Sequence, residues 1–345
     1  MTSNAASDGR PTLMEQEAGE AAVVVARMLE ANREAFGAIG RRLRTAPPAA
    51  VVTCARGSSD HAATYAKYLI ETMTGTPTAS SALSIASLYD APALAGNRLC
   101  LAISQSGKSP DLLAAVEQQR DAGAFVVALI NAEDSPLAQL ADVVILLSAG
   151  VERSVAATKS YIASLAAIAA LVAAWTEDDA LENALTALPG QLAEAFALDW
   201  SPAIDAFRGT ANLFVLGRGY GLGAAQEAAL KFKETSGLHA ESFSAAEVRH
   251  GPMAIVGDAF HVLALGGTDR AAASVRSIAD EFRGRGATVL LADPAGGDLP
   301  AIAAHPAIEP ILLIQSFYRM ASALALARGH NPDSPPHLNK VTETL

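Results

Sequence analysis

The stretch AAVVTCARGSSDHAATYAKYLIETM, residues 49–73, decides the fold class. Its first six residues, AAVVTC, have the apolar character of a strand that is buried in a sheet. Arg56-Gly57-Ser58-Ser59 forms a polar loop, and residues 60–73 continue with the spacing of a helix. A buried strand, a glycine loop and a helix in this order predict a parallel sheet covered by helices.

The same alternation recurs along the whole chain. Strand-type runs, each followed by a helical pattern, occur in the first half at LCLAIS (99–104), FVVALIN (125–131) and DVVILLS (142–148). The second half repeats the scheme with ANLFVLGRG (211–219), FHVLALGG (260–267) and ATVLLAD (287–293) and with helices expected at 223–235, 270–284 and 310–328. We therefore expect an α/β fold with two doubly wound, flavodoxin-like parallel sheets flanked by helices.

The two halves resemble each other as an internal duplication. Arg56-Gly57 and Arg218-Gly219 align at an offset of 162 residues, and alanines of the following helices match at the same offset. Alanine-rich helices match easily by chance, but the strand, the glycine loop and the helix recur in the same order. This order favours duplication.

The boundaries of the expected parts follow from these patterns and from proline and glycine breaks. Residues 159–207 are helical in pattern and connect the halves, with breaks near 189–190 and 202. The expected parts are a disordered arm (1–12), an N-terminal helix (13–45), a first domain that binds phosphate (46–190), a second domain with a catalytic helix (200–330) and a C-terminal tail that closes the site (331–345).

Composition excludes several classes of function. The chain has 345 residues, a net charge of −11 and no cluster of basic residues, so nucleic-acid binding is not expected. The most apolar run, SLAAIAALVAAW (164–175), is too short to span a membrane and fits a buried helix. Cys54 and Cys100 lie in strand-like runs without zinc spacing, which predicts buried free thiols. We expect a cytoplasmic protein that needs no metal and no cofactor.

A polar loop that could bind an anion follows the second strand run. Residues Ser104 to Ser109 combine hydroxyls, a side-chain amide and the free N–H groups of a helix N-terminus. A simple helix cap is the alternative interpretation. No P-loop pattern occurs here, and the GRGYGLG loop (217–223) lacks the third glycine of a dinucleotide site, so nucleotide binding is not expected.

A second polar stretch, EAALKFKETSGLHAESFSAAEVRHGP (227–252), carries groups suited to proton transfer. Glu227, Lys231 and Glu234 share one helix face at i, i+4 and i+7, and Gly237 ends the helix before His250. The alternative is a solvated face with salt bridges and an unrelated histidine. Because this helix follows a glycine-rich strand exit, the stretch favours a functional site.

Four separated motifs resemble the sugar isomerase (SIS) domains of glucosamine-6-phosphate synthase and of related deaminases. They are AALKFKETSGLHAESFSAAEVRHGP, ISQSGKSPD (103–111), SVAATKSY (154–161) and HLNKVTETL (337–345), and the resemblance runs from about residue 13 to the end. It implies two tandem SIS domains. It also implies that substrate phosphate is bound by side chains of the first domain, namely Ser58, Ser59, Ser104, Gln105, Ser106 and Ser109.

The resemblance also assigns residues around the sugar. Glu152, Val155 and Ala157 match the loop that closes over it, although the synthase has serine at the position of Ala157. His250 matches the residue that opens the sugar ring in the neighbouring subunit's pocket, which implies a homodimer with shared sites. Lys340, in a tail where lysine is ordinarily inert, matches a pocket lysine that can form a Schiff base with an open-chain ketose.

These residues predict the chemistry. Glu234 is expected to move a proton between C1 and C2 of an open-chain sugar phosphate, and Lys231 to stabilise the oxyanion or to relay a proton. The resemblance covers no glutamine amidotransferase domain, so we expect an isomerising deaminase that converts glucosamine-6-phosphate to fructose-6-phosphate and ammonia.

Other functions stay open at this point. They are a phosphosugar aldose–ketose isomerase without amine chemistry, an aminotransferase-related enzyme, and a deaminase acting on galactosamine-6-phosphate or a fructosamine phosphate. A regulator that senses sugar phosphates is the alternative outside enzymes. The presence of Glu234, Lys231, His250 and Lys340 favours an enzyme.

Overall fold

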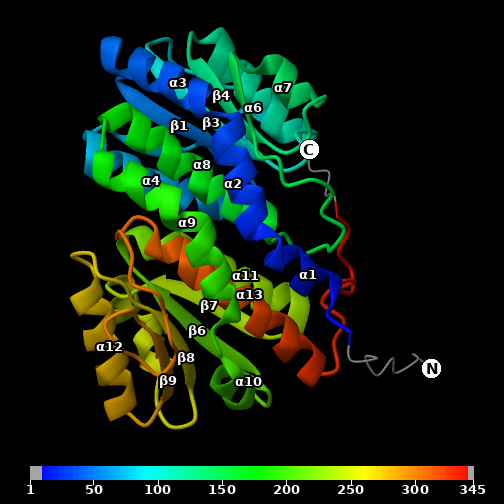
Figure 1. The fold of residues 1–345 in the computed structure, drawn as a ribbon, viewed down its shortest axis with the longest axis vertical. Coiled ribbons are helices and arrows are strands. Elements are labelled where there is room, and N and C mark those ends of the chain that lie inside the picture. Colours follow the sequence, from blue (N-terminus) through cyan, green and yellow to red (C-terminus); the bar gives the residue numbers. More distant parts are fainter. Residues whose placement is uncertain (1–9, 341–345) are drawn as a thin grey trace. The chain divides into compact units, whose positions relative to one another are not determined.

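The computed structural model describes residues 10–340, which form two compact units (Figure 1). Unit 1 contains the described residues up to Ala22 together with Glu152–Lys159 and Gly190–Lys340. Unit 2 contains Val23–Val151 and Ser160–Pro189. Each unit is built on its own parallel sheet. Because each unit combines stretches that are separate in sequence, the chain crosses between the units more than once.

The sheet of unit 2 has five parallel strands in the order β2-β1-β3-β4-β5. Their bounds are β1 Ala50–Cys54, β2 Thr78–Ser80, β3 Arg98–Ser104, β4 Phe125–Ile130 and β5 Val143–Leu146. This is the strand order of flavodoxin-like folds, in which the topology reverses between the first and the third strand. The predicted fold class is confirmed for this half of the chain.

Helices cover both faces of this sheet. Cys100 and Ala102 of β3 pack in one apolar cluster with Leu112 and Val116 of α6. Leu101, between the two, points to the opposite face of the sheet, which α4 covers. Figure 1 shows α6 and α7 on one side of the sheet and α4 on the other. The helices of this region are α2 Ala21–Ala31, α3 Arg33–Thr45, α4 Ser58–Thr74, α5 Ser84–Ser87, α6 Pro110–Asp121, α7 Pro136–Leu140, α8 Lys159–Thr176 and α9 Asp179–Ala197.

The two cysteines lie on neighbouring strands of this sheet. Both are free and buried, as predicted, with their Sγ atoms 3.9 Å apart. The contact with Cys54 and the burial raise the pKa of the Cys100 thiol well above its usual value. This thiol therefore stays protonated and unreactive at neutral pH.

The sheet of unit 1 has four parallel strands in the order β7-β6-β8-β9, which repeats the first four positions of the other sheet. Helix α12 packs on one face, and α11 contacts β6, β7 and β8 on the other. The elements are β6 Asn212–Gly217, β7 His239–Ser244, β8 His261–Leu265, β9 Thr288–Ala292, α1 Leu13–Gly19, α10 Ser201–Phe207, α11 Leu222–Ser236, α12 Ala272–Gly284, α13 Glu309–Ala327 and the 3-10 turns η1 Gly219–Gly221, η2 Glu247–His250 and η3 Pro252–Ile255. The predicted duplication of a doubly wound sheet is confirmed.

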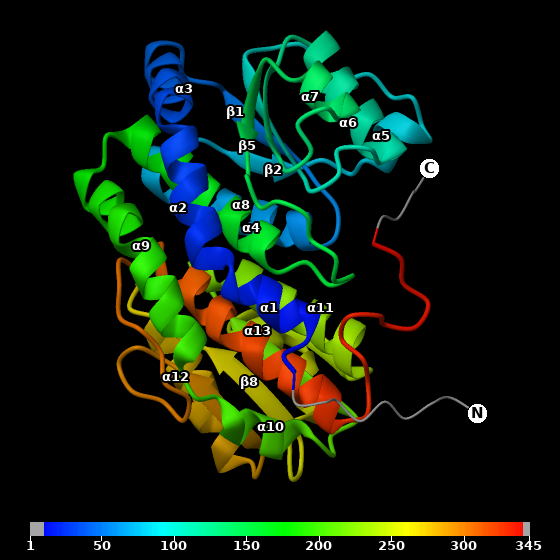
Figure 2. The same ribbon diagram turned by 45° about the vertical axis from the view of Figure 1, so that its right-hand side comes forward.

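The N-terminal region differs from the single helix expected over 13–45, because it forms three helices. Asn32 interrupts the chain between α2 and α3, where its side-chain amide donates to the carbonyls of Met28 and Leu146. The first helix, α1, belongs to unit 1 and lies beside α13 (Figure 2). The side-chain amide of Gln315 in α13 donates to the Ala18 carbonyl at 2.9 Å. Contacts far away in sequence therefore set these breaks.

The break expected near residues 189–190 is not found, because α9 runs through Pro189. Proline has a fixed φ that is compatible with a helix, and its cost is the loss of one backbone hydrogen bond and a steric clash with the preceding turn. The expected arm at residues 1–12 and the end of the tail lie mostly outside the described residues, although Thr12 caps α1 and Pro332 is buried.

Among the described residues, the helices α8 and α13 are long and apolar enough to cross a membrane by length and composition alone. Within the structure, 89% and 78% of their most apolar windows are buried. Core helices of water-soluble folds have the same composition, so these helices are weak support for a membrane span. The run SLAAIAALVAAW lies in α8 and is a buried helix, as predicted.

Candidate active site

The residues predicted to bind phosphate gather at one edge of the unit 2 sheet. Strands β1 and β3 are parallel neighbours, with Cys54 paired to Ala102, so their carboxyl ends lie side by side. Ser58 and Ser59 begin α4 just after β1, and the segment Ser104 to Ser109 begins with the last residue of β3. The reversal of strand order between β1 and β3 is where open α/β sheets bind ligands.

The Ser104–Ser109 loop is held rigidly by its backbone. Gly107 has φ +63°, and a Cβ atom there would lie 2.6 Å from Ser135 Oγ. The Gly107 amide donates to Ser104 Oγ at 3.0 Å, and its carbonyl accepts from the Leu137 amide at 3.2 Å. Only glycine fits this position without strain, and two hydrogen bonds hold its backbone.

The other hydroxyl and amide groups of this loop remain accessible. Gln105, Ser106 and Ser109 are half-buried. Ser109 is the N-cap of the twelve-residue helix α6, and its side chain makes no capping hydrogen bond. Neutral donors at a helix N-terminus are suited to an anion, and phosphate binding by this loop stays a prediction.

Helix α11 brings Glu227, Lys231 and Glu234 into contact in unit 1. Lys231 Nζ lies 2.6 Å from Glu234 Oε2 and 3.1 Å from Glu227 Oε1. The side chains of Glu227 and Lys231 are 0% and 1% exposed, whereas that of Glu234 is 20% exposed. This is therefore not a solvated helix face with surface salt bridges. One carboxylate of the array reaches solvent and the other is sealed in the core.

The charge on Lys231 is stabilised by its neighbours. Burial opposes the charged ammonium, yet the Glu227 and Glu234 carboxylates outweigh it and raise the pKa of Lys231 above its usual range. Tyr318 of α13 adds a hydrogen bond, with its hydroxyl donating to Glu227 Oε1 at 3.3 Å. Lys231 is thus a fixed cation at neutral pH.

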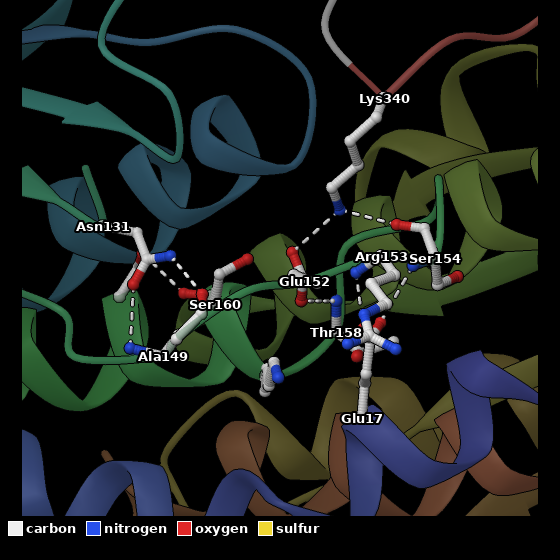
Figure 3. Close-up of polar contacts among 12 residues, drawn as sticks. Glu17, Asn131, Ala149, Glu152, Arg153, Ser154, Thr158, Ser160 and Lys340 are labelled. Atoms are coloured by element: carbon white, nitrogen blue, oxygen red, sulfur yellow. Dashed lines mark hydrogen bonds and ion pairs between the residues drawn. The ribbon is translucent and has the colours of Figure 1, made fainter. Parts of the chain in front are cut away.

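The loop after residue 151 meets the C-terminal tail (Figure 3). Glu152 Oε1 accepts from the Thr158 amide at 2.9 Å, and Glu152 Oε2 pairs with Lys340 Nζ at 3.0 Å. Lys340 also donates to the Ser154 carbonyl at 2.6 Å. The structure therefore joins Glu152 and Lys340, two predicted site residues, and the half-buried Val155 and Ala157 lie in the same loop.

Helix α1 supports this loop through Glu17, a residue that the sequence analysis did not single out (Figure 3). Glu17 Oε1 accepts from the Arg153 amide at 2.5 Å, and Oε2 accepts from the Ser154 amide at 3.1 Å. Burial raises the pKa of the Glu17 carboxyl, although the two amides act against that shift. Glu20 of the same region pairs with the buried Lys159 at 2.7 Å. No local signal in the sequence distinguishes Glu17 from the neighbouring acid Glu15 of the same helix.

His250 lies apart from these groups. It ends the 3-10 turn η2 and is exposed, and within residues 10–340 no hydrogen bond or ion pair joins it to α11. Its expected action in a neighbouring subunit stays a prediction.

No metal cluster is found in the described part of the chain, and one large cavity of unit 2 lies away from the predicted site residues. Among residues 10–340, no group of three or more His, Cys, Asp or Glu side chains could hold a metal ion. A cavity of about 740 Å³ lies in unit 2 between α2, α3, α8 and α9, and none of the predicted site residues lines it.

The chain thus contains two parallel α/β sheets with the same strand order, and the edge of one of them is rich in hydroxyl groups. The family model of the SIS domain matches residues 47–174 and 207–296, which are most of both sheets. The chain belongs to the SIS domain family, and the resemblance seen in its motifs is confirmed.

Curated relatives show the same affiliation. The chain is 33% identical over 327 residues to glutamine–fructose-6-phosphate aminotransferase (isomerizing) of Symbiobacterium thermophilum, covering 88% of this chain and 53% of the relative. An enzyme of that name from Thermus thermophilus is 31% identical, covering 84% and 51%. The chain thus spans about half the length of the curated relatives that it matches.

Solved structures extend the comparison. A provisionally assigned phosphosugar isomerase from Silicibacter pomeroyi DSS-3 is 44% identical, with a TM-score of 0.89 over 93% of this chain and 100% of that one. Glucosamine-6-phosphate deaminase from Thermotoga maritima has a TM-score of 0.78 over 96% of this chain and 100% of its own, at 21% identity. At that identity the second likeness shows the fold alone.

Proposed function

We propose that this chain is an isomerising deaminase that converts glucosamine-6-phosphate to fructose-6-phosphate and ammonia. The observation that carries the proposal is the array on α11, in which a permanently charged Lys231 lies 2.6 Å from the partly exposed Glu234 carboxylate. A carboxylate beside a fixed cation is suited to moving a proton on a carbon next to a carbonyl group. The match to isomerizing aminotransferases of fructose-6-phosphate supports the substrate class.

The proposed reaction balances without a cofactor. Glu234 removes the C2 proton of the open-chain aminosugar phosphate, giving an enolamine, and returns a proton to C1. The product carries an imine at C2, which adds water and releases ammonia. Lys231 stabilises the negative charge that develops on the C1 oxygen, and its raised pKa favours this role over proton relay.

The remaining predicted residues take supporting roles. The hydroxyls and amides of the Ser104–Ser109 loop, with Ser58 and Ser59, bind the phosphate group. His250 opens the sugar ring from the partner subunit of a homodimer. Lys340 is paired with Glu152, so it must leave that carboxylate and lose a proton before it could attack a ketose carbonyl.

The proposal is tested by ammonia release from the 6-phosphates of glucosamine, galactosamine and fructosamine. We expect turnover with glucosamine-6-phosphate and none with the Glu234→Gln variant. Absence of ammonia from every aminosugar phosphate would contradict the proposal. Glutamine is included as a separate substrate, and its hydrolysis or the transfer of its amine to fructose-6-phosphate would indicate the aminotransferase reaction of the relatives.

A phosphosugar aldose–ketose isomerase is the second candidate function. The 44% identity to a provisionally assigned phosphosugar isomerase favours it. It uses the same proton transfer, so only the group at C2 differs. Interconversion of an aldose and a ketose phosphate without ammonia release would establish this function. Binding of sugar phosphates without turnover of any of them would point to a sensing regulator.

A further inference from the structure

Arg56 lies at the same strand edge as the proposed phosphate site. The parallel pairing of β1 with β3 ends with Cys54 opposite Ala102. Arg56 lies two residues after Cys54, and Ser104, the first residue of the Ser104–Ser109 loop, lies two residues after Ala102. Arg56 is therefore placed at the point where the strand order reverses.

A buried carboxylate fixes the guanidinium. Arg56 Nε and Nη2 donate to Asp111 Oδ2 at 2.9 and 2.6 Å, and the Asp111 side chain is 0% exposed. Asp111 lies in the first turn of α6, directly after the loop, and its other oxygen accepts from the Leu112 amide. The Arg56 side chain is 52% exposed, and its Nη1 forms no hydrogen bond to the described residues. One edge of the guanidinium is held while the other remains available.

The local charges explain why such a residue is needed. A phosphate on this loop would lie near the carboxylate of Asp111, which alone would repel it. The hydroxyls of the loop carry no charge, and its one lysine, Lys108, is exposed and has no ion pair in the described part of the chain. A guanidinium pre-positioned by a carboxylate binds phosphate oxygens with little further loss of side-chain entropy.

We propose that Arg56, held by Asp111, is a substrate-binding residue that donates to the phosphate bound at Ser59 and the Ser104–Ser109 loop. This inference rests on the proposed function, because it requires a phosphorylated substrate. A purely structural role, in which Arg56 only neutralises Asp111, is the competing explanation.

The experiment measures two quantities for Arg56→Gln: the Kd of inorganic phosphate by calorimetry, and kcat and KM for the sugar phosphate. We expect both Kd and KM to rise roughly 10–100-fold, because the variant loses a charge-assisted hydrogen bond to the phosphate. The value of kcat should change little. Arg56→Lys should recover part of the affinity. Unchanged phosphate affinity in Arg56→Gln would overturn the inference.

A matched control exists in unit 1, where Arg276 donates to the buried Asp293 at 2.7 and 2.9 Å. Arg276→Gln removes the same kind of ion pair from a residue outside the predicted site, so it should leave the phosphate Kd unchanged. The double variant Arg56→Gln/Asp111→Asn removes the uncompensated carboxylate and so preserves folding. If phosphate binding returns in that variant, Arg56 acts only on Asp111 and the inference is wrong.

Failure of the proposed function gives a different result. If wild-type protein binds neither inorganic phosphate nor a sugar phosphate, the phosphate site itself is absent. If the wild type binds them and Arg56→Gln binds them equally well, only the role of Arg56 is refuted.

Discussion

The two sheets share a strand order but differ in the chemistry of their carboxyl edges. In unit 2 that edge carries serine hydroxyls and a glutamine amide after β3. In unit 1 the corresponding edge, after β8, carries two acidic residues. Glu309 accepts from the Thr268 amide at 2.8 Å, and Asp269 lies nearby. Burial raises the pKa of the Asp269 carboxyl, although backbone amides and Arg218 oppose the shift.

The difference indicates how a duplicated fold divides its work. An acidic edge is unfavourable for a phosphate group, so we expect anion binding at the edge of unit 2 and not at that of unit 1. The groups that we predict to be reactive in unit 1 lie on α11, the helix after β6, where three charges are placed on one face. The fold supplies two equivalent edges, and the side chains decide what each one binds.

The largest expected effect concerns Glu234 on helix α11. Glu234→Gln keeps the shape of the side chain and removes the base, so kcat should fall by about 10²–10⁴ with little change in substrate binding. Exchange of the C2 proton with deuterated solvent, followed by NMR, should disappear in step with turnover. If the variant still exchanges that proton at the wild-type rate, another residue is the base.

A second change tests the burial of charge on the same helix. Lys231→Met removes the cation between two carboxylates and leaves Glu227 charged in the core, which should cost about 3–5 kcal/mol in the free energy of unfolding. Denaturant unfolding measures this cost, and the double variant Lys231→Met/Glu227→Leu should recover much of it. A stability loss below about 1 kcal/mol for Lys231→Met would show that the pair behaves like a surface ion pair.

A third change acts on the hydroxyl edge of unit 2. Ser104→Ala combined with Ser106→Ala should raise KM far more than it lowers kcat, because the phosphate is remote from the reacting carbons. Each lost hydrogen bond to a charged group is worth roughly 1.5–3 kcal/mol. Steady-state kinetics distinguish this result from the Glu234→Gln result, and an unchanged KM would remove the phosphate from this loop.

Glu17 gives a smaller expected effect. Glu17→Gln replaces one of two acceptors with a donor that faces a backbone amide, which should cost about 1.5–3 kcal/mol of local stability in the loop. We expect faster hydrogen exchange of the Arg153 and Ser154 amides and a higher KM. Glu15→Gln, on the same helix but directed to Arg319, is the control and should change neither.

The smallest signal comes from mixing two inactive variants, Glu234→Gln and His250→Asn. If His250 acts in the partner's pocket, a mixed dimer has one pocket with both wild-type groups, and some activity returns after subunit exchange. Recovery no greater than that of either parent would place His250 in the pocket of its own subunit.

Much of the architecture follows from local sequence, since apolar runs such as LCLAIS and the turns at Gly107 and Gly237 fix strands and loops within a few residues. The array on α11 was also predictable, because helical spacing alone aligns Glu227, Lys231 and Glu234. Its burial was not, since Tyr318 and the packing of α13 come from about 90 residues further along the chain.

The parts that sequence reasoning missed depend on distant contacts. Asn32 separates two helices by bonding to Leu146, which is 114 residues away. Glu17 looks like any acid in an amphipathic helix until its partners, Arg153 and Ser154, are known. No local pattern predicts such pairs, because the two partners lie more than 100 residues apart in sequence.

The attachment of the loop and the tail to α1 has a consequence for the order of folding. Glu17 bonds across 136 residues, Lys340 reaches Glu152 across 188, and Asp333 accepts from the Leu13 amide across 320. Contacts of such long range close large loops and are slow to form compared with local helices and neighbouring strands. A nascent chain on the ribosome can thus complete the five-stranded sheet early. The loop after residue 151, whose Glu152 pairs with Lys340, takes its final form only after synthesis has passed residue 340.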